Sequence, residues 1–186
     1  MNDAPGITGL GRRILVVGPP CAGKSTLAAR LARAISAPHV ELDALHWEPG
    51  WTPASRETFL ARVREATAGD SWVVDGNYTE AQQVFWERVT GVVWLDLPLG
   101  TVIPRILRRA WRRWRSREVL WNTNRETFLK HFRPGDDSLV WWALKTHRRR
   151  RDRYERLMRG GSPEGARWVR VRSAGAVEAW AEQNLS

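Results

Sequence analysis

Residues 18–25 read G-P-P-C-A-G-K-S and match the pattern G-x-x-x-x-G-K-[ST] in full. Glycines let the backbone bend tightly, so that its N–H groups can approach phosphate oxygens. Lys24 supplies a mobile positive charge for the β- and γ-phosphates of a nucleotide, and the Ser25 hydroxyl suits Mg²⁺. The pattern therefore predicts a phosphate-binding loop for ATP and Mg²⁺. The residues that we expect to bind the nucleotide from this segment are Gly18, Ala22, Gly23, Lys24, Ser25 and Thr26.

The context of this segment is the one that a phosphate-binding loop requires. An apolar run at 13–17, R-I-L-V-V, predicts a buried strand before it, and S-T-L-A-A-R-L-A-R-A-I predicts a helix over 25–35 after it. The positive end of that helix points at the loop. A plain glycine-rich turn is the alternative, and the flanking strand and helix argue against it. Cys21 is a small loop residue in this interpretation, with a redox-sensing role as the open alternative.

A carboxylate at the end of a strand commonly supports nucleotide-bound Mg²⁺. Two apolar runs, W-V-V-D at 72–75 and V-V-W-L-D-L-P at 92–98, each carry an aspartate where the strand should end. We expect Asp75 to hold the ion together with Ser25, and Asp96 is the second choice. A loop cap or turn residue is the alternative for any such aspartate.

The remaining pattern alternates between strands and helices. Further strands are predicted at 39–43 and 168–172, and further helices from Thr52-Pro53 to about Gly69, at 101–115, 138–158 and 174–183. Such alternation favours an α/β fold with a parallel sheet, whose ligands bind at the carboxyl ends of the strands. Asp43, Asp75 and Asp96 are all predicted at strand ends, so one crevice could collect several of them.

Composition limits the classes of protein that remain. The length of 186 residues fits one domain with a substantial core, and the single cysteine excludes an intramolecular disulfide and a cysteine-based zinc site. No apolar run approaches the ~20 residues that span a membrane, and the first residues do not resemble a signal peptide. We therefore expect a cytoplasmic protein that does not interact with membranes.

The net charge of +10 is concentrated in one part of the chain. Residues 101–159 hold 18 Lys/Arg against 6 Asp/Glu. A concentrated positive field predicts an anionic partner, such as a polyphosphate, a phosphorylated substrate or nucleic acid. A solvated basic helical face is the alternative. The run R-I-L-R-R-A-W-R-R-W-R-S-R also interleaves arginine with Trp111 and Trp114, a pattern that suits single-stranded nucleic acid.

Taken together, these segments resemble the adenylate kinase-like P-loop proteins, and more narrowly the bacterial group labelled topology modulation proteins. The resemblance is carried by G-P-P-C-A-G-K-S-T-L-A, V-E-L-D-A-L-H-W, W-V-V-D-G-N-Y, V-V-W-L-D-L-P, L-W-N-T-N-R-E and S-L-V-W-W. It covers nearly the whole chain. It implies a three-layer P-loop NTPase fold of the nucleoside monophosphate kinase type, with a five-stranded parallel sheet and a short helical lid.

The same resemblance implies how the chain is divided. We expect one domain over 1–186, with a core of 12–43, 71–110 and 140–186, an acceptor-binding insertion at about 44–70 and a lid at about 112–137. It also implies that Arg105 stacks on adenine and that Arg109 contacts the transferred phosphoryl group. An arginine after the lid completes the clamp, with Arg148, Arg149 and Arg153 as candidates, of which Arg149 is our choice.

One departure from the adenylate kinase pattern, and one match to kinases that phosphorylate a hydroxyl, bear on the identity of the acceptor. Adenylate kinases carry D-G-F-P-R where this chain has D-G-N-Y at 75–78, so the arginine that binds an acceptor phosphate is missing. Kinases of this superfamily that phosphorylate a hydroxyl often have a carboxylate base after the second strand, which would be Asp43, although a turn or helix cap is the alternative. His46 and Trp47 either line the acceptor pocket or pack in the core.

The sequence thus predicts an enzyme that transfers the γ-phosphoryl group of Mg-ATP to a small acceptor, with Lys24, Asp43, Arg109 and Arg149 in the reaction. A nucleic-acid-associated NTPase that affects DNA topology through the Arg/Trp-rich segment is the alternative, and plain ATP hydrolysis is a further one. The partners are ATP and a small molecule, with nucleic acid as the weaker possibility. Either a monomer or a homodimer fits.

Overall fold

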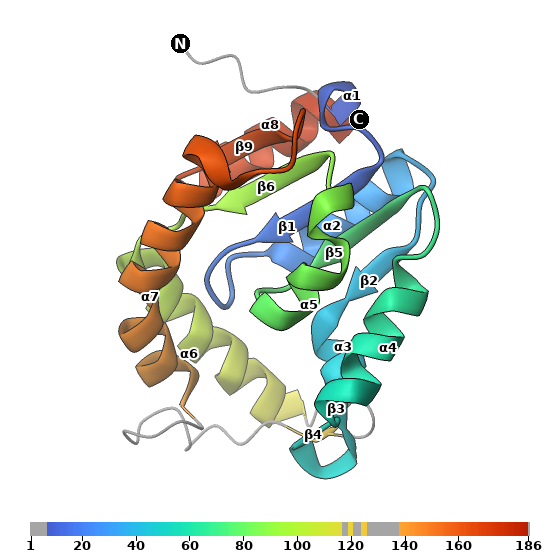
Figure 1. Ribbon diagram of the computed structural model, residues 1–186. Helices are drawn as coiled ribbons and strands as arrows, with labels where there is room; N and C mark the ends of the chain where they lie inside the picture. Colours follow the sequence, from blue (N-terminus) through green and yellow to red (C-terminus); the bar gives the residue numbers. More distant parts are fainter. Residues whose placement is uncertain (1–6, 117–118, 121–123, 126–137, 186) are drawn as a thin grey trace.

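A computed structural model describes residues 7–116, 119–120, 124–125 and 138–185. Its centre is a five-stranded sheet in the order β2-β5-β1-β6-β9, and every neighbouring pair of strands is parallel. This arrangement confirms the predicted α/β class (Figure 1). The strands are β1 (Arg13–Val17), β2 (His39–Glu41), β5 (Trp72–Asp75), β6 (Gly91–Leu95) and β9 (Arg167–Val171).

Alternation of side chains along the strands builds two cores from one sheet. In β1, Ile14 and Val16 face one core while Leu15 and Val17 face the other, and all four side chains are buried. Parallel strands covered on both faces read as continuous apolar runs because neither face meets water. This explains why R-I-L-V-V and W-V-V-D carry no polar alternation.

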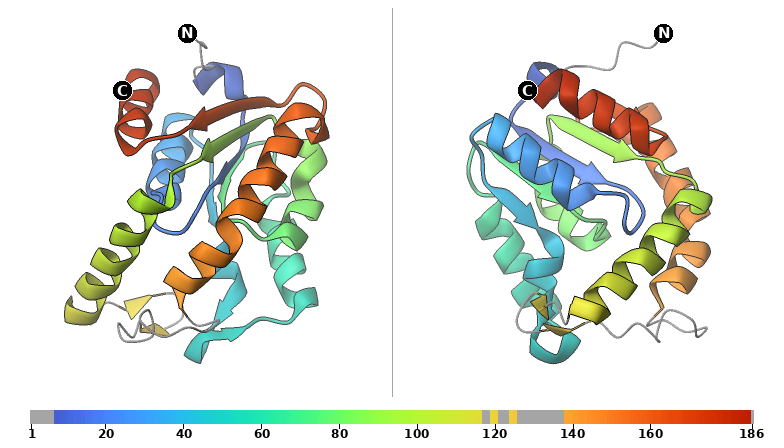
Figure 2. Two further views of the ribbon diagram at one scale, coloured as in Figure 1. Left: turned by 90° about the vertical axis from the view of Figure 1, so that its left-hand side faces the viewer. Right: turned by 180° about the vertical axis from the view of Figure 1, so that it is seen from behind.

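Helices cover both faces and complete the three layers (Figures 1 and 2). One core packs under α2 and α8, and the other under α4, α5 and the end of α7. Short elements connect these layers. The bounds are α1 (Ile7–Leu10), α2 (Lys24–Ala34), α3 (Leu42–His46), α4 (Arg56–Ala66), α5 (Thr79–Phe85), α6 (Leu99–Ser116), α7 (Leu139–Arg156) and α8 (Ala174–Leu185), with the shorter turns η1 (Pro49–Trp51), η2 (Trp86–Arg88) and η5 (Leu157–Gly161).

The helices α6 and α7 pack against each other and extend beyond the carboxyl edge of the sheet (Figure 2). Two short hairpins lie at the same end: β3 (Trp47–Glu48) pairs with β4 (Thr52–Pro53), and β7 (Val119–Leu120) pairs with β8 (Asn124–Arg125). The strand β8 lies beside η1. Most of the predicted lid, 112–137, lies outside the described residues. Among the residues that the structure describes, no helix combines the length and apolar character that a bilayer crossing requires.

Two predicted boundaries were wrong. The helix predicted from Thr52-Pro53 begins at Arg56, where the Ser55 Oγ accepts a hydrogen bond from the Thr58 N–H at 3.1 Å. Thr52 and Pro53 pair instead with Glu48 and Trp47 in a hairpin, because a cap-like dipeptide does not by itself decide between a turn and a helix start.

The strand predicted over 39–43 also ends early. Its last pairing joins Glu41 to Asp75, the last residue of β5, so no ladder partner remains for the residues that follow. The chain turns there into α3, and Asp43 lies in the first turn of that short helix.

A cluster of ion pairs ties β6, β9 and α7 together. The buried carboxylate of Asp96 accepts hydrogen bonds from the Arg170 guanidinium at 2.6 and 3.0 Å, and that guanidinium lies 4.1 Å from the Trp94 ring centroid. Arg170 also donates to Glu155 at 2.7 Å, which lowers the pKa of the Glu155 carboxyl. Arg170 therefore bridges two strands and one of the long helices.

Replacement of Arg170 by leucine should destabilise the fold, because a buried carboxylate loses its main partner. The loss should be about 3 kcal/mol at pH 7, measured by urea unfolding. The control is Arg172→Leu, which removes an exposed guanidinium 4.0 Å from the same carboxylate and should cost less than ~1 kcal/mol. The difference in unfolding free energy between the two variants should become smaller below about pH 4. The pKa of Glu155 is lowered in the folded state, so its ion pair with Arg170 stops stabilising the fold as the carboxylate is protonated. Equal stability of the two variants would contradict the role of Arg170.

Candidate functional site

The phosphate-binding loop joins β1 to α2 in the conformation that its glycines permit. Gly18 has a φ of 153°, and a Cβ there would lie 2.7 Å from the Leu95 carbonyl oxygen, which requires glycine. Gly23 has a φ of 96° and precedes the first helical residue, Lys24. The N-terminal turn of α2, including Ser25 and Thr26, is therefore open to an anion at the positive end of the helix.

The register between β1 and β5 places Asp75 beside this loop. Asp75 pairs with Val16 and is only 3% exposed, and its Oδ1 accepts a hydrogen bond from the Ser25 Oγ at 3.2 Å. Its Oδ2 lies 2.7 Å from the His39 Nε2, a contact that raises the pKa of His39. Among the described residues, the strand-end carboxylate next to the loop hydroxyl is thus Asp75.

A nucleotide-bound magnesium ion fits this donor pair. Mg²⁺ in such sites is held by one or two protein oxygens together with phosphates and water, so a dedicated cage of protein ligands is not required. Consistent with that, no group of three or more His, Cys, Asp or Glu side chains within the described ranges could hold a metal alone. Asp96, the second candidate, bonds Arg170 instead, as described above.

Several charged side chains converge on Lys24. Its Nζ donates to the Pro19 carbonyl oxygen at 3.0 Å. Burial lowers the pKa of Lys24, the negative charges of Asp43 and Asp75 raise it, and the positive charges of Arg150 and Arg109 lower it. The fold thus brings together residues that lie far apart in the sequence, and two carboxylates and three cations share one end of the sheet.

Asp43 reaches this site from α3. Its Oδ1 accepts a hydrogen bond from the Tyr78 hydroxyl at 2.6 Å. Tyr78 in turn lies in a group of rings, with the His46 centroid at 4.7 Å and the Phe59 centroid at 5.2 Å. Burial lowers the pKa of His46, so this ring stays neutral near pH 7. The ring centroids of His46 and Trp47 are 4.9 Å apart, and both rings belong to the aromatic group next to Asp43.

The two arginines predicted on one face of α6 both face inward. Arg105 makes a long hydrogen bond of 3.5 Å to the Ala22 carbonyl oxygen of the loop. Arg109 is half-buried, and its Nε has no hydrogen-bond partner in the part of the chain that the structure describes. A desolvated guanidinium with an unfilled donor is suited to an anionic ligand.

The arginine that the structure brings to the site from α7 is Arg150, which the sequence reasoning missed. Arg149 and Arg148 are exposed, and Arg153 donates to Thr79 and Gln82 at 2.7 Å each. Arg150 packs 3.7 Å over the Trp142 ring, its Nη1 is buried without a partner among the described residues, and burial lowers its pKa to about 10. Residues 148–151 are four successive arginines, so the sequence does not indicate which of them points into the site. The rotation of α7 about its axis determines this.

Two further residues were not expected from the sequence. Asn77 brackets Gly18: its Nδ2 donates to the Gly18 carbonyl oxygen at 2.7 Å, and its Oδ1 accepts from the Gly18 N–H at 3.2 Å. The Tyr154 hydroxyl of α7 donates to the same Oδ1 at 3.2 Å. A small cavity of ≈ 20 Å³ lies between the loop and α7, lined among others by Pro19 and Arg150. The loop, the D-G-N-Y turn and α7 thus form one connected unit.

Comparison with known proteins agrees with this geometry. Residues 14–128 match the family model described as "AAA domain", which covers more than half of the chain. The chain therefore belongs to that AAA domain family. A search of curated proteins gives no match.

Solved structures show the same fold. A shikimate kinase from Acinetobacter baumannii in complex with shikimate has a TM-score of 0.54 at 17% identity, covering 93% of this chain and 90% of that one. A shikimate kinase from Bacteroides thetaiotaomicron has a TM-score of 0.53 at 17% identity, covering 92% and 97%. A gluconokinase from Sinorhizobium meliloti 1021 has a TM-score of 0.50 at 21% identity, covering 94% of each chain. The fold is that of the P-loop kinases, and the predicted three-layer architecture with five parallel strands is confirmed.

Adjacent arginines on α7 allow a matched test of the cation assignment. Arg150→Ala should lower ATP turnover by about 100-fold or more, since it removes a desolvated cation next to Lys24. Arg149→Ala removes an exposed guanidinium one residue away and should leave turnover within about twofold. Turnover is measured as Mg²⁺-dependent ADP formation. A larger loss in Arg149→Ala than in Arg150→Ala would restore the original sequence-based choice.

Proposed function

We propose that this protein is a Mg-ATP-dependent phosphotransferase whose acceptor is the hydroxyl group of a small molecule. The observation that carries this proposal is the position of Asp43, a carboxylate whose charge acts on Lys24 and thus on the place where the γ-phosphoryl group would lie. A hydroxyl acceptor must lose a proton, whereas a nucleotide phosphate is already ionised. A carboxylate at this position could take the proton of a hydroxyl acceptor.

The nucleotide would be held by the loop and the helix that follows it. Backbone N–H groups of 18–26, the Lys24 ammonium and the end of α2 would bind the phosphates, with Arg105 next to the adenine. Ser25 and Asp75 would hold Mg²⁺, which neutralises charge on the β- and γ-phosphates when it is bound.

The reaction is an in-line displacement at the γ-phosphorus. The acceptor oxygen forms a new P–O bond, the bond from the γ-phosphorus to the β–γ bridging oxygen breaks, and ADP leaves. The hydroxyl proton passes to Asp43. Arg109 and Arg150 neutralise charge on the transferred group, a contribution that can reach 10³-fold or more in rate.

The acceptor side argues against a nucleoside monophosphate. Thr79 stands where adenylate kinases carry the arginine of D-G-F-P-R, and it accepts a hydrogen bond from Arg153. Two arginines of α4 are already paired, Arg62 with Glu48 at 2.8 Å and Arg56 with Glu80 at 3.3 Å. The similar structures are named as kinases of shikimate and of gluconate, which are hydroxyl compounds. The narrower resemblance to adenylate kinase-like topology modulation proteins rests on the sequence motifs alone.

Assay of ADP formation with a panel of acceptors tests this function. The panel contains AMP, the other nucleoside monophosphates, D-gluconate, shikimate, hexoses and nucleosides. We expect stimulation by a hydroxyl compound, with loss of all turnover in Lys24→Ala and at least a 100-fold loss of the stimulated turnover in Asp43→Asn. Stimulation by one monophosphate that survives in Asp43→Asn would instead identify a nucleotide kinase.

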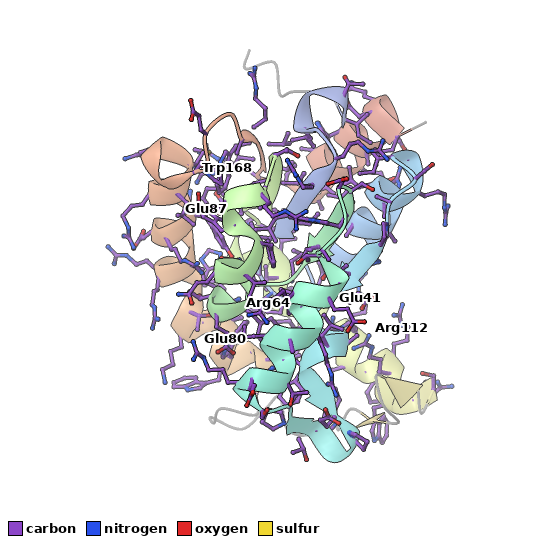
Figure 3. All side chains as sticks on the ribbon, turned by 45° about the vertical axis from the view of Figure 1, so that its right-hand side comes forward. Glu41, Arg64, Glu80, Glu87, Arg112 and Trp168 are labelled. Carbon is purple, nitrogen blue, oxygen red and sulfur yellow. The ribbon has the colours of Figure 1, made fainter. Side chains whose placement is uncertain are left out.

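A nucleic-acid-associated NTPase is the second candidate, because of one specific observation. The four large apolar side chains exposed in the described ranges all lie on α6 and α7: Trp111 (48%), Trp114 (50%), Trp141 (45%) and Leu144 (45%). The same helices carry exposed arginines, such as Arg112 on α6 (Figure 3). Arginine neutralises phosphate and tryptophan stacks on bases, so this surface could hold a single strand.

The second candidate is tested by fluorescence anisotropy with a labelled dT oligonucleotide. If it is correct, the affinity should fall steeply between 50 and 200 mM salt, and Trp111→Ala with Trp114→Ala should weaken binding at least tenfold. Under our proposal we expect weak binding that is indifferent to the two tryptophans. A strong and tryptophan-dependent affinity would favour the nucleic-acid function.

A further inference from the structure

The segment from the end of β5 to the start of α5 contacts several parts of the site in turn. Asp75 bonds Ser25, Asn77 bonds Gly18, Tyr78 bonds Asp43 and Thr79 bonds Arg153. Gly76 makes the turn possible: its φ is 140°, and a Cβ there would lie 2.8 Å from the Leu42 Cβ. The three residues that differ from the adenylate kinase pattern D-G-F-P-R, Asn77, Tyr78 and Thr79, therefore each have a specific partner.

Tyr78 holds Asp43 by a short and well-supported hydrogen bond. The hydroxyl donates to the Asp43 Oδ1 at 2.6 Å and accepts from the Trp47 indole, so its own hydrogen-bonding capacity is filled. Burial and the charge of Asp43 raise the pKa of Tyr78 far above its ordinary value, so the phenol remains a neutral donor. The ring packs between His46 and Phe59, which fixes its direction.

This hydrogen bond occupies the Oδ1 of Asp43 and leaves its Oδ2 available. Within the described residues, no further hydrogen bond or ion pair to Asp43 is present, so its Oδ2 remains for a ligand. The carboxylate charge acts on Lys24. A carboxylate that is fixed through one oxygen, and whose charge acts on Lys24, is suited to orient a hydroxyl group.

Resting on the proposed function, we propose that Tyr78 is a positioning residue for the acceptor hydroxyl: it holds the Asp43 Oδ1, so that the Oδ2 is placed to accept the proton of that hydroxyl. Asn77, its neighbour, serves the donor side, because both of its hydrogen bonds to the loop go to Gly18. Neighbouring residues of one turn thus support the ATP site and the acceptor site, and mutation can separate the two roles.

The contact itself can be tested without any acceptor. The chain has two tyrosines, Tyr78 and Tyr154, so labelling with [¹³Cζ]tyrosine gives two NMR signals, assigned with Tyr78→Phe. In Asp43→Asn the Tyr78 signal should move and the Tyr154 signal should stay. An unmoved Tyr78 signal would overturn the proposal, whatever the protein phosphorylates.

The positioning role is tested by kinetics. Turnover is measured with the acceptor that stimulates in the panel above, or with water where none does. Tyr78→Phe keeps the ring and should lower kcat about 10- to 100-fold. The affinity for a fluorescent ATP analogue should not change, and the Tm should fall by no more than about 5 °C, as loss of one buried hydroxyl predicts. The double variant with Asp43→Asn should be no slower than Asp43→Asn alone. Asn77→Ser is the matched control, and it should lower the affinity for the ATP analogue at least fivefold.

The outcomes separate this inference from the proposed function. If no hydroxyl compound stimulates turnover, the proposed function fails, while the NMR signals and basal turnover still decide whether Tyr78 positions Asp43. If Tyr78→Phe turns over as fast as wild type, or slows the Asp43→Asn protein further by the same factor, then Tyr78 has a packing role and the inference is wrong.

Discussion

The register of β5 against β1 is the constraint on which the site depends. Pairing of Asp75 with Val16 brings a carboxylate to the last residue of the phosphate-binding loop, Ser25, whose hydroxyl donates to it at 3.2 Å. Because the strands are parallel, their carboxyl ends open on one edge, and β2 ends at the same level through Glu41 opposite Asp75. A shift of one residue would turn Asp75 into the opposite core. The place of the loop, the contact between Ser25 and Asp75 and the turn into α3 therefore follow from the pairing of these strands.

Charge at this edge is arranged for a ligand rather than for stability. Burial disfavours the ammonium of Lys24 and the guanidinium of Arg150. The charges of Asp43 and Asp75 favour the Lys24 ammonium, whereas the nearby arginines disfavour it. Asp96 differs, because its buried negative charge is paired with Arg170 and this ion pair stabilises the fold. An anion with several charges would relieve the cations of the site, so the protein should gain stability from a bound polyphosphate. In the proposed reaction, the transferred phosphoryl group would meet cations that are already in place.

Sequence reasoning predicted the long features and missed what depends on packing. The phosphate-binding loop, the five strands and Asp75 follow from local patterns, because apolar runs and the glycine spacing have few other uses. The position of Arg150 could not be predicted, since α7 carries four successive arginines and its rotation is set by Tyr154 and Ala143 in the core. The hairpin at Thr52 and the short helices α3 and α5 span too few residues for a periodic signal. Tyr78 is recognisable only as a departure from a family pattern, and its partner Asp43 becomes visible in three dimensions.

The central claim is transfer of a phosphoryl group to a hydroxyl, and ³¹P NMR of the reaction products tests it most directly. Wild-type protein is incubated with Mg-ATP and the hydroxyl compounds of the panel, and Lys24→Ala is the control. The account predicts a new phosphomonoester signal that grows with ADP and is absent with Lys24→Ala. If ATP is consumed and inorganic phosphate is the sole new signal besides ADP, the protein is an ATPase and the account is contradicted.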